Sequence, residues 1–143
     1  RVIYYSTSGR NSQPGYERVS FDELLEQSDI VSIHAPLDEN TLGLMNKEAF
    51  AKMKKSAILL NVGRGPIINE ADLAEALNNK TIAAAGLDVL SVEPMQEDNP
   101  LRGIKDSERL LITPHIAWAG VEARNRLMGI ILGQIKEFFK AHE

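Results

Sequence analysis

Short apolar runs alternate along this chain with longer amphipathic stretches, and this alternation restricts the fold more than any other feature. It is typical of βα units wound around a parallel sheet. Apolar runs rich in β-branched residues predict strands at residues 1–6, 29–34, 57–62, 82–89 and 110–113. Amphipathic stretches predict helices at residues 20–27, 46–55, 70–77 and 121–141. We therefore expect an α/β fold in which all these strands lie parallel in one sheet with helices packed on its faces.

Local signals support several of these elements. Ser20 followed by Glu23 has the pattern of a capping box at the start of a helix. Asn69 is a helix-capping residue immediately before Glu70. Residues 57–62 are apolar on both faces, as expected for a strand covered by helices. The polar stretch 91–108 is the longest predicted connection, and long loops in compact domains are usually functional or mobile.

Composition excludes several classes of function. The chain has 143 residues, 43% hydrophobic and 25% charged, which is ordinary for one globular domain. A net charge of -4 with scattered Lys and Arg leaves no basic stripe for a nucleic acid. No cysteine and three isolated histidines predict acid–base chemistry without a metal. The apolar runs are too short to span a bilayer and no signal pattern is present, so we expect a cytoplasmic location without membrane contact.

Three residues with chemically useful side chains each follow a predicted strand: Arg64, Glu93 and His115. Ligands bind at the carboxyl edge of an open α/β sheet, where such positions meet. Taken alone, each has a simpler explanation as a solvated loop Arg, a turn Glu before a proline, or a strand-end His. Their joint occurrence favours a shared site.

The chemistry of the three side chains is complementary. The planar guanidinium group of Arg64 can donate two parallel hydrogen bonds to a carboxylate. The flanking glycines Gly63 and Gly65 would let the backbone approach a ligand closely. Histidine is the side-chain type suited to proton exchange near neutral pH, so His115 can take a proton from a hydroxyl group and return it. A carboxylate such as Glu93, hydrogen-bonded to the imidazole, would orient the ring and favour its protonated form.

Several motifs occur in one order across nearly the whole chain. They are Ser32-Ile33-His34-Ala35-Pro36-Leu37 with Thr41, Val62-Gly63-Arg64-Gly65, Gly86-Leu87-Asp88-Val89 leading to Glu93-Pro94, Asn99-Pro100-Leu101, and Thr113-Pro114-His115-Ile116-Ala117. In order and spacing they resemble the signatures of D-isomer-specific 2-hydroxyacid dehydrogenases. The resemblance is closest to the glycerate dehydrogenase or hydroxypyruvate reductase branch, to which Trp118 also points, although Trp118 could equally be a packing residue.

This resemblance implies a Rossmann-like NAD(P)-binding domain. It also implies an oxidoreductase that transfers a hydride between NAD(P)H and a small 2-oxo acid or D-2-hydroxy acid, such as hydroxypyruvate and glycerate. By motif position, the implied catalytic residues are Arg64, Glu93 and His115. The implied cofactor-binding residues are Ser6, Ala35, Pro36, Thr41, Val62, Gly63, Asp88 and Ala117. For His34, a structural role or a backbone contact to the cofactor ribose is expected, and no residue is expected to bind a metal.

The sequence departs from the family pattern at its start. It contains no G-x-G-x-x-G motif, and Arg1 to Ser6 resembles the second strand of the family. We therefore expect residues 1–143 to form a partial NAD(P)-binding domain with a C-terminal helix, without the first βα unit, the glycine-rich loop and the substrate domain. An unpaired strand edge should then lie beside residues 1–6.

Two questions remain open from the sequence. NAD is expected as the cofactor. NADP is the alternative, because Ser6 stands where an NAD-preferring enzyme usually has Asp, and hydroxyl groups and Arg10 could hold the 2′-phosphate. The complete enzyme is expected to be a homodimer. The alternatives to an enzyme are a non-catalytic dinucleotide-sensing or interaction protein and an inactive fragment.

Overall fold

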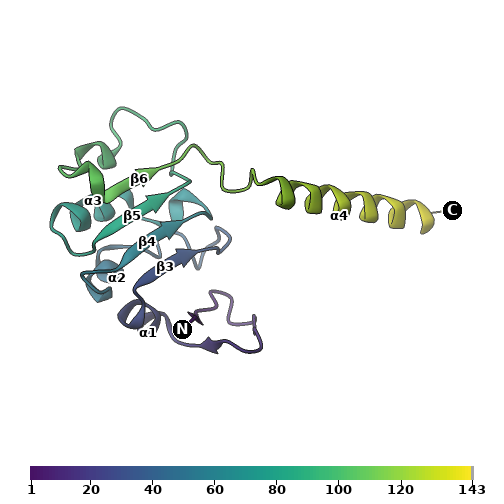
Figure 1. Cartoon of the computed structure of the whole chain (residues 1–143), viewed down its shortest axis with the longest axis horizontal. Coiled ribbons are helices and arrows are strands. Elements are labelled where there is room, and N and C mark those ends of the chain that lie inside the picture. The colour runs from purple at the N-terminus through teal and green to yellow at the C-terminus, as the bar shows by residue number, and fades with distance from the viewer. Residues whose placement is uncertain (143) are drawn as a thin grey trace.

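Four parallel strands form the main sheet of the computed structural model, which describes residues 1–142 (Figure 1). In spatial order they are β3 (Ile30–Ile33), β4 (Ile58–Asn61), β5 (Ala84–Leu87) and β6 (Leu110–Ile112). The last residues of the four strands are paired in register, Ile33 with Asn61, Asn61 with Leu87, and Leu87 with Ile112. The carboxyl ends of all four strands therefore meet at one edge of the sheet.

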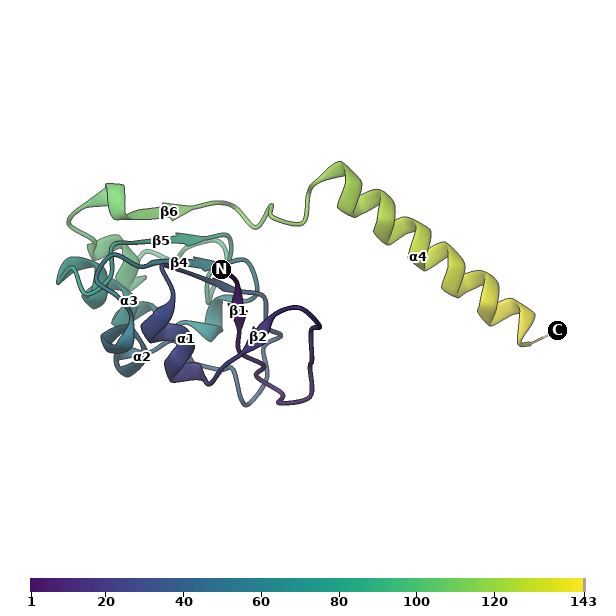
Figure 2. The ribbon, with the colours of Figure 1, turned by 60° about the horizontal axis from the view of Figure 1, so that its bottom comes forward.

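Three helices pack on one face of this sheet, as Figure 2 shows edge-on: α1 (Phe21–Gln27), α2 (Lys47–Lys52) and α3 (Glu70–Asn78). The hydrophobic core lies between them and the sheet and includes Leu25, Phe50, Leu59, Leu73 and Leu77, each at most 1% exposed. On the other face Ile30 and Leu111 are exposed. The expectation that residues 57–62 are covered on both faces is therefore wrong for the part of the chain described, because alternate side chains of the sheet face solvent.

Side-chain caps start the helices where the sequence predicts them. The hydroxyl of Ser20 accepts the N–H of Glu23, and the Glu23 carboxylate accepts the N–H of Ser20 at 2.9 Å, which confirms the capping box of α1. Asn69 caps α3 in the expected way, and Asn46 caps α2. Helix α2 is shorter than the predicted 46–55, because the chain turns extended at Met53.

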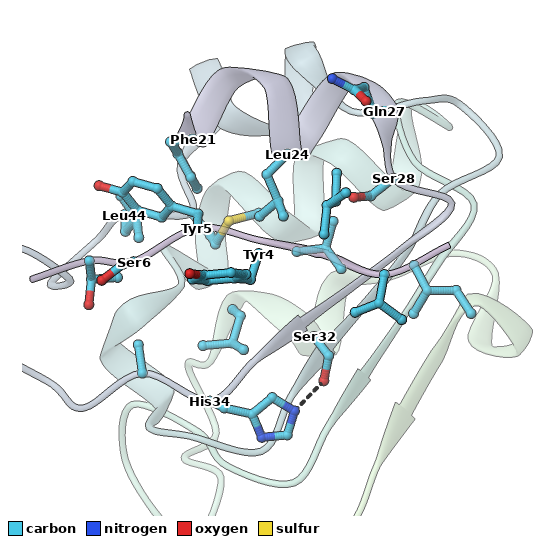
Figure 3. Close-up of a pocket in the computed structure, with 18 of the residues that line it drawn as sticks. Tyr4, Tyr5, Ser6, Phe21, Leu24, Gln27, Ser28, Ser32, His34 and Leu44 are labelled. Atoms are coloured by element: carbon cyan, nitrogen blue, oxygen red, sulfur yellow. Dashed lines mark hydrogen bonds between the residues drawn. The ribbon is translucent and has the colours of Figure 1, made fainter. Parts of the chain in front are cut away.

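The first strand lies outside the main sheet, so the prediction of a single sheet was wrong. Strand β1 (Ile3–Tyr4) pairs in parallel with β2 (Glu17–Arg18), a short exposed strand in the stretch 7–19, where the sequence predicts neither a strand nor a helix. A cavity of about 910 Å³ separates β1 from β3 (Figure 3). No strand within residues 1–142 pairs with the edges of β1 and β3 that face this cavity. The unpaired edge expected beside residues 1–6 is thus present.

Helix α4 (Val121–Lys140) extends away from the sheet and the three other helices at the end of the segment that follows β6 (Figures 1 and 2). It contains no buried residue. Within residues 1–142, none of the helices combines the length and the apolar character that crossing a membrane requires. Short 3-10 helices occur at Gly65–Ile67 (η1), Pro100–Gly103 (η2) and Ser107–Arg109 (η3).

Candidate active site

Glu93 and His115 form a hydrogen-bonded pair at the carboxyl edge of the sheet. The imidazole Nδ1 lies 2.9 Å from Glu93 Oε2, which confirms the expected proximity of the two side chains. Glu93 Oε1 accepts the backbone N–H of Leu90 at 2.9 Å. The Leu90 hydrogen bond, and then the His115 hydrogen bond, lower the pKa of Glu93. Because Nδ1 faces Glu93, Nε2 is the imidazole nitrogen that can meet a substrate.

The backbone of His115 has a left-handed conformation, with a φ of 55°. Residues other than glycine rarely adopt this region, and such strain persists where the surroundings enforce it. Here the N–H of His115 donates to the carbonyl oxygen of Thr113 at 3.0 Å. The indole N–H of Trp118 donates to the carbonyl oxygen of His115 at 2.8 Å, although the Trp118 side chain is otherwise exposed. Both bonds hold the tight turn that presents the imidazole.

Asp88 anchors the segment that contains His115. Its carboxylate is buried, and Oδ1 accepts the hydroxyl of Thr113 at 2.5 Å and the N–H of Ile116 at 2.9 Å. Oδ2 accepts the N–H of Ala117 at 2.8 Å. Burial opposes ionisation of Asp88, but the hydrogen bonds from Thr113, Ala117 and Ile116 outweigh it and lower the pKa. Asp88 and Ala117, predicted as cofactor-binding residues, are thus bonded to each other in the structure.

Asn61, the last residue of β4, shapes the loop that contains Arg64. It is fully buried, its Oδ1 accepts the N–H of Gly63 at 3.0 Å, and its Nδ2 donates to the carbonyl oxygen of Arg64 at 3.0 Å. Arg64 itself is exposed, and its Nη1 donates to the Gly63 carbonyl oxygen at 2.8 Å. Sequence reasoning assigned no role to Asn61, although an amide at the end of an apolar strand is a signal for such a loop anchor.

Gly65 allows two loops of the site to touch. A Cβ atom at this position would lie 1.9 Å from the carbonyl carbon of Leu90 and 2.4 Å from the nitrogen of Ser91. The close approach that Gly65 permits is therefore to the backbone of the chain itself. It sets the loop after β4 directly against the loop after β5.

A hollow of about 540 Å³ opens beside Arg64, at the carboxyl ends of β3 and β4. Its walls combine several of the predicted cofactor-binding residues with Arg64. The lining residues are His34, Ala35, Pro36, Leu37, Val62, Gly63 and Arg64. Small and apolar walls with few polar groups fit a flat heteroaromatic ring. The structure thus brings Ala35, Pro36, Val62 and Gly63 together with one predicted catalytic residue.

The larger cavity between β1 and β3 contains other predicted residues. Ser6, which is buried, lines it together with Ala35 and Pro36. His34 lies in its wall, with Nε2 2.9 Å from the hydroxyl of Ser32 (Figure 3). Thr41 lies in the wall of neither cavity.

Thr41 is fully buried, whereas the nearby Ala35 is half-buried and Pro36 is exposed. Its hydroxyl donates to the carbonyl oxygen of Pro36 at 2.7 Å and accepts the N–H of Asp38 at 2.8 Å. In the structure the Thr41 side chain therefore holds the turn that positions Pro36.

Residues 1–117 match the NAD binding domain of the D-isomer specific 2-hydroxyacid dehydrogenases. A hydroxypyruvate reductase of Blautia hydrogenotrophica is 53% identical over 122 residues, which make up 85% of this chain and 37% of that protein. The chain therefore spans little more than a third of the length of this relative.

Solved structures agree with the sequence match. An acyclic imino acid reductase in complex with NADPH and D-Arg superposes with a TM-score of 0.84 at 33% identity, covering 98% of this chain and 43% of that one. The NAD complex of a D-isomer specific 2-hydroxyacid dehydrogenase from Lactobacillus delbrueckii ssp. bulgaricus superposes with a TM-score of 0.82 at 27% identity, covering 99% of this chain and 46% of that one.

Proposed function

Because the chain belongs to the D-isomer specific 2-hydroxyacid dehydrogenase family, we propose that it supplies the acid–base pair and the nicotinamide side of an oxidoreductase. The reaction is hydride transfer between NAD(P)H and a small 2-oxo acid, which becomes a D-2-hydroxy acid. The observation that supports this most is the 2.9 Å contact between His115 Nδ1 and Glu93 Oε2 at the same sheet edge as Arg64.

Each of the three side chains has one task in this proposal. The Arg64 guanidinium binds the substrate carboxylate. In the direction of reduction, His115 donates the proton on Nε2 to the carbonyl oxygen as the hydroxyl forms, and in oxidation it takes that proton back. Glu93, whose pKa is lowered by the Leu90 and His115 hydrogen bonds, stays ionised near neutral pH and stabilises the positive charge on the imidazolium.

The cofactor is proposed to lie across the carboxyl ends of β3 and β4. The hollow bounded by Ala35, Pro36, Val62 and Gly63 fits the nicotinamide ring. When bound, the nicotinamide supplies the hydride. Ser6 is proposed to lie beside the adenosine ribose of the cofactor. Residues 5–16 contain no carboxylate that would repel a 2′-phosphate on that ribose. NAD and NADP are therefore both proposed as ligands.

Hydroxypyruvate is the first substrate to test, because the Blautia relative is named a hydroxypyruvate reductase. We further propose that residues 1–143 act as part of the NAD(P)-binding domain in a homodimeric enzyme. A cytoplasmic location is proposed with it, since a chain without cysteine needs no oxidising compartment to fold.

A steady-state assay of the full-length protein tests the proposal. Hydroxypyruvate, glyoxylate and pyruvate should each be offered with NADH and with NADPH, and cofactor binding should be measured separately by fluorescence. We expect turnover of at least one 2-oxo acid. Cofactor binding without any turnover would favour a dinucleotide-sensing protein instead. The absence of both cofactor binding and turnover would favour an inactive chain.

A further inference from the structure

Glu70, the first residue of α3, is hydrogen-bonded to both ends of the loop that contains Glu93. Its Oε1 accepts the backbone N–H of Ser91 at 2.7 Å. Its Oε2 accepts a side-chain N–H of Asn99 at 2.8 Å. Ser91 and Asn99 flank Glu93 in the sequence, so one carboxylate ties together both ends of the segment 91–99.

We propose that Glu70 is a positioning residue for the Glu93–His115 pair. The inference rests on the function proposed above and adds a residue to it. Glu70 acts through the loop, because its two carboxylate oxygens bond Ser91 and Asn99 and neither bonds the pair itself.

Other contacts hold single points of the segment 91–99: the backbone of Gly65 lies against Ser91, Met95 packs against the core, and Arg102 donates to the carbonyl oxygen of Gln96 at 2.9 Å. In the part of the chain that the structure describes, only the Glu70 carboxylate joins its two ends to each other. Leu90 before the segment and Leu101 after it are buried, whereas Ser91, Val92, Glu93 and Pro94 are all exposed. An exposed loop samples more conformations when its ends are not joined, and a movement of Glu93 away from His115 lengthens the 2.9 Å contact between them. Fixing both ends of the loop removes most of that freedom.

The arrangement allows a test by exchange of two side chains. Glu70→Gln keeps the size of the side chain and an oxygen for the N–H of Ser91, but its NH₂ group then faces the NH₂ group of Asn99. Combining Glu70→Gln with Asn99→Asp restores a donor opposite an acceptor. The new aspartate can still cap η2, as Asn99 Oδ1 does by accepting the N–H of Leu101 at 2.9 Å.

Helix α3 also offers a matched control. Glu75 is an acidic residue on the same helix whose carboxylate pairs with Lys47 at 2.8 Å on the exposed surface. Glu75→Gln therefore removes one charge and one ion pair from α3 without touching the loop.

The experiment compares kcat, KM and the pH profile of hydroxypyruvate reduction in the full-length protein. Glu70→Gln should lower kcat about tenfold, since small displacements of catalytic groups carry penalties of this order, and should shift the pH profile. The double variant should recover kcat to within about twofold of the parent. Glu75→Gln should match the parent. The affinity for the cofactor should stay the same in all variants.

Two kinetic outcomes overturn the proposal. The first is a Glu70→Gln protein with the kcat and pH profile of the parent. The second is a loss of kcat in Glu70→Gln that is explained by a lower melting temperature and that the added Asn99→Asp substitution does not restore.

If the parent reduces no 2-oxo acid, the proposed function fails, and the role of Glu70 is decided by other measurements. These are amide exchange of residues 90–99 and the NMR signal of the His115 ring Nδ1–H. Faster exchange and a changed ring signal in Glu70→Gln support positioning. An unchanged loop and ring overturn it.

Discussion

The sheet with α1–α3 and the helix α4 use the same kind of residues in opposite ways. We call the sheet with α1–α3 the body, and in it the leucines of the core are buried. In α4, Leu127, Ile131 and Ile135 lie on one side of the helix and are exposed. The family match also ends at residue 117, before α4 begins at Val121. The difference shows that an apolar pattern predicts the type of an element but not its packing partner.

The largest expected effect is on catalysis, and it should be confined to the body. His115→Gln removes the proposed acid and should lower kcat by about 10²–10⁴-fold, while the affinity for the cofactor stays near that of the parent. Steady-state kinetics and cofactor titration of the full-length protein measure both quantities. The matched control is His142→Gln, the same substitution at an exposed residue just after α4, which should leave kcat unchanged. Equal losses in both variants would contradict the assignment of the chemistry to the body.

The next largest effect concerns stability. Leu73 is fully buried, so Leu73→Ala should lower the local free energy of unfolding by about 2–5 kcal/mol. Native-state amide exchange of β4 and β5 reports this value for the body separately. Leu42→Ala, at a position 65% exposed, is the control and should cost little. A Leu73→Ala protein with parental protection would show that the core between sheet and helices is not what stabilises the strands.

A smaller effect is expected from acid. The pKa of Asp88 is lowered in the folded protein, so its ionised form stabilises the fold above the ordinary aspartate value of 3.8, and this stabilisation is lost as pH falls through the lowered value. Amide protection of β5 and β6 should therefore stay constant down to about pH 5 and decrease as the pH falls further, through the lowered pKa of Asp88. The Asp88→Asn protein should have weaker amide protection of β5 and β6 at neutral pH and should lose less of it as the pH falls. Parallel losses in parent and variant would assign the acid sensitivity to other groups.

The smallest effect is expected in α4. Leu132 is 52% exposed, so Leu132→Ala should change the amide protection of β4 and β5 by no more than about 0.5 kcal/mol. The same exchange experiment measures it beside Leu73→Ala. A cost similar to that of the core leucine would mean that α4 packs on the body in solution, and the contrast between the two regions would fail.

Local signals predicted much of this fold. The capping box of Ser20 and Glu23 and the cap at Asn69 depend on neighbours within a few residues, so both were predicted from the sequence. The pairing of Glu93 with His115 was also predictable, because parallel strands place their carboxyl ends at one edge.

Features that depend on distant contacts were not predictable in this way. Strand β2 at Glu17–Arg18 is polar and exposed, and only its pairing with β1 makes it a strand. The contacts of Glu70 with Ser91 and Asn99 span 21 and 29 residues and leave no periodic pattern in the sequence. The burial of Thr41 likewise follows from the turn around it.

The contact at Gly65 has a mechanical consequence. The loop with Arg64 and the loop leading to Glu93 press backbone against backbone, without a flexible side chain between them to absorb displacement. The loop proposed to bind the substrate carboxylate and the loop that leads to the proton-transfer pair are therefore spaced by backbone contact, and any side chain at position 65 would force them apart.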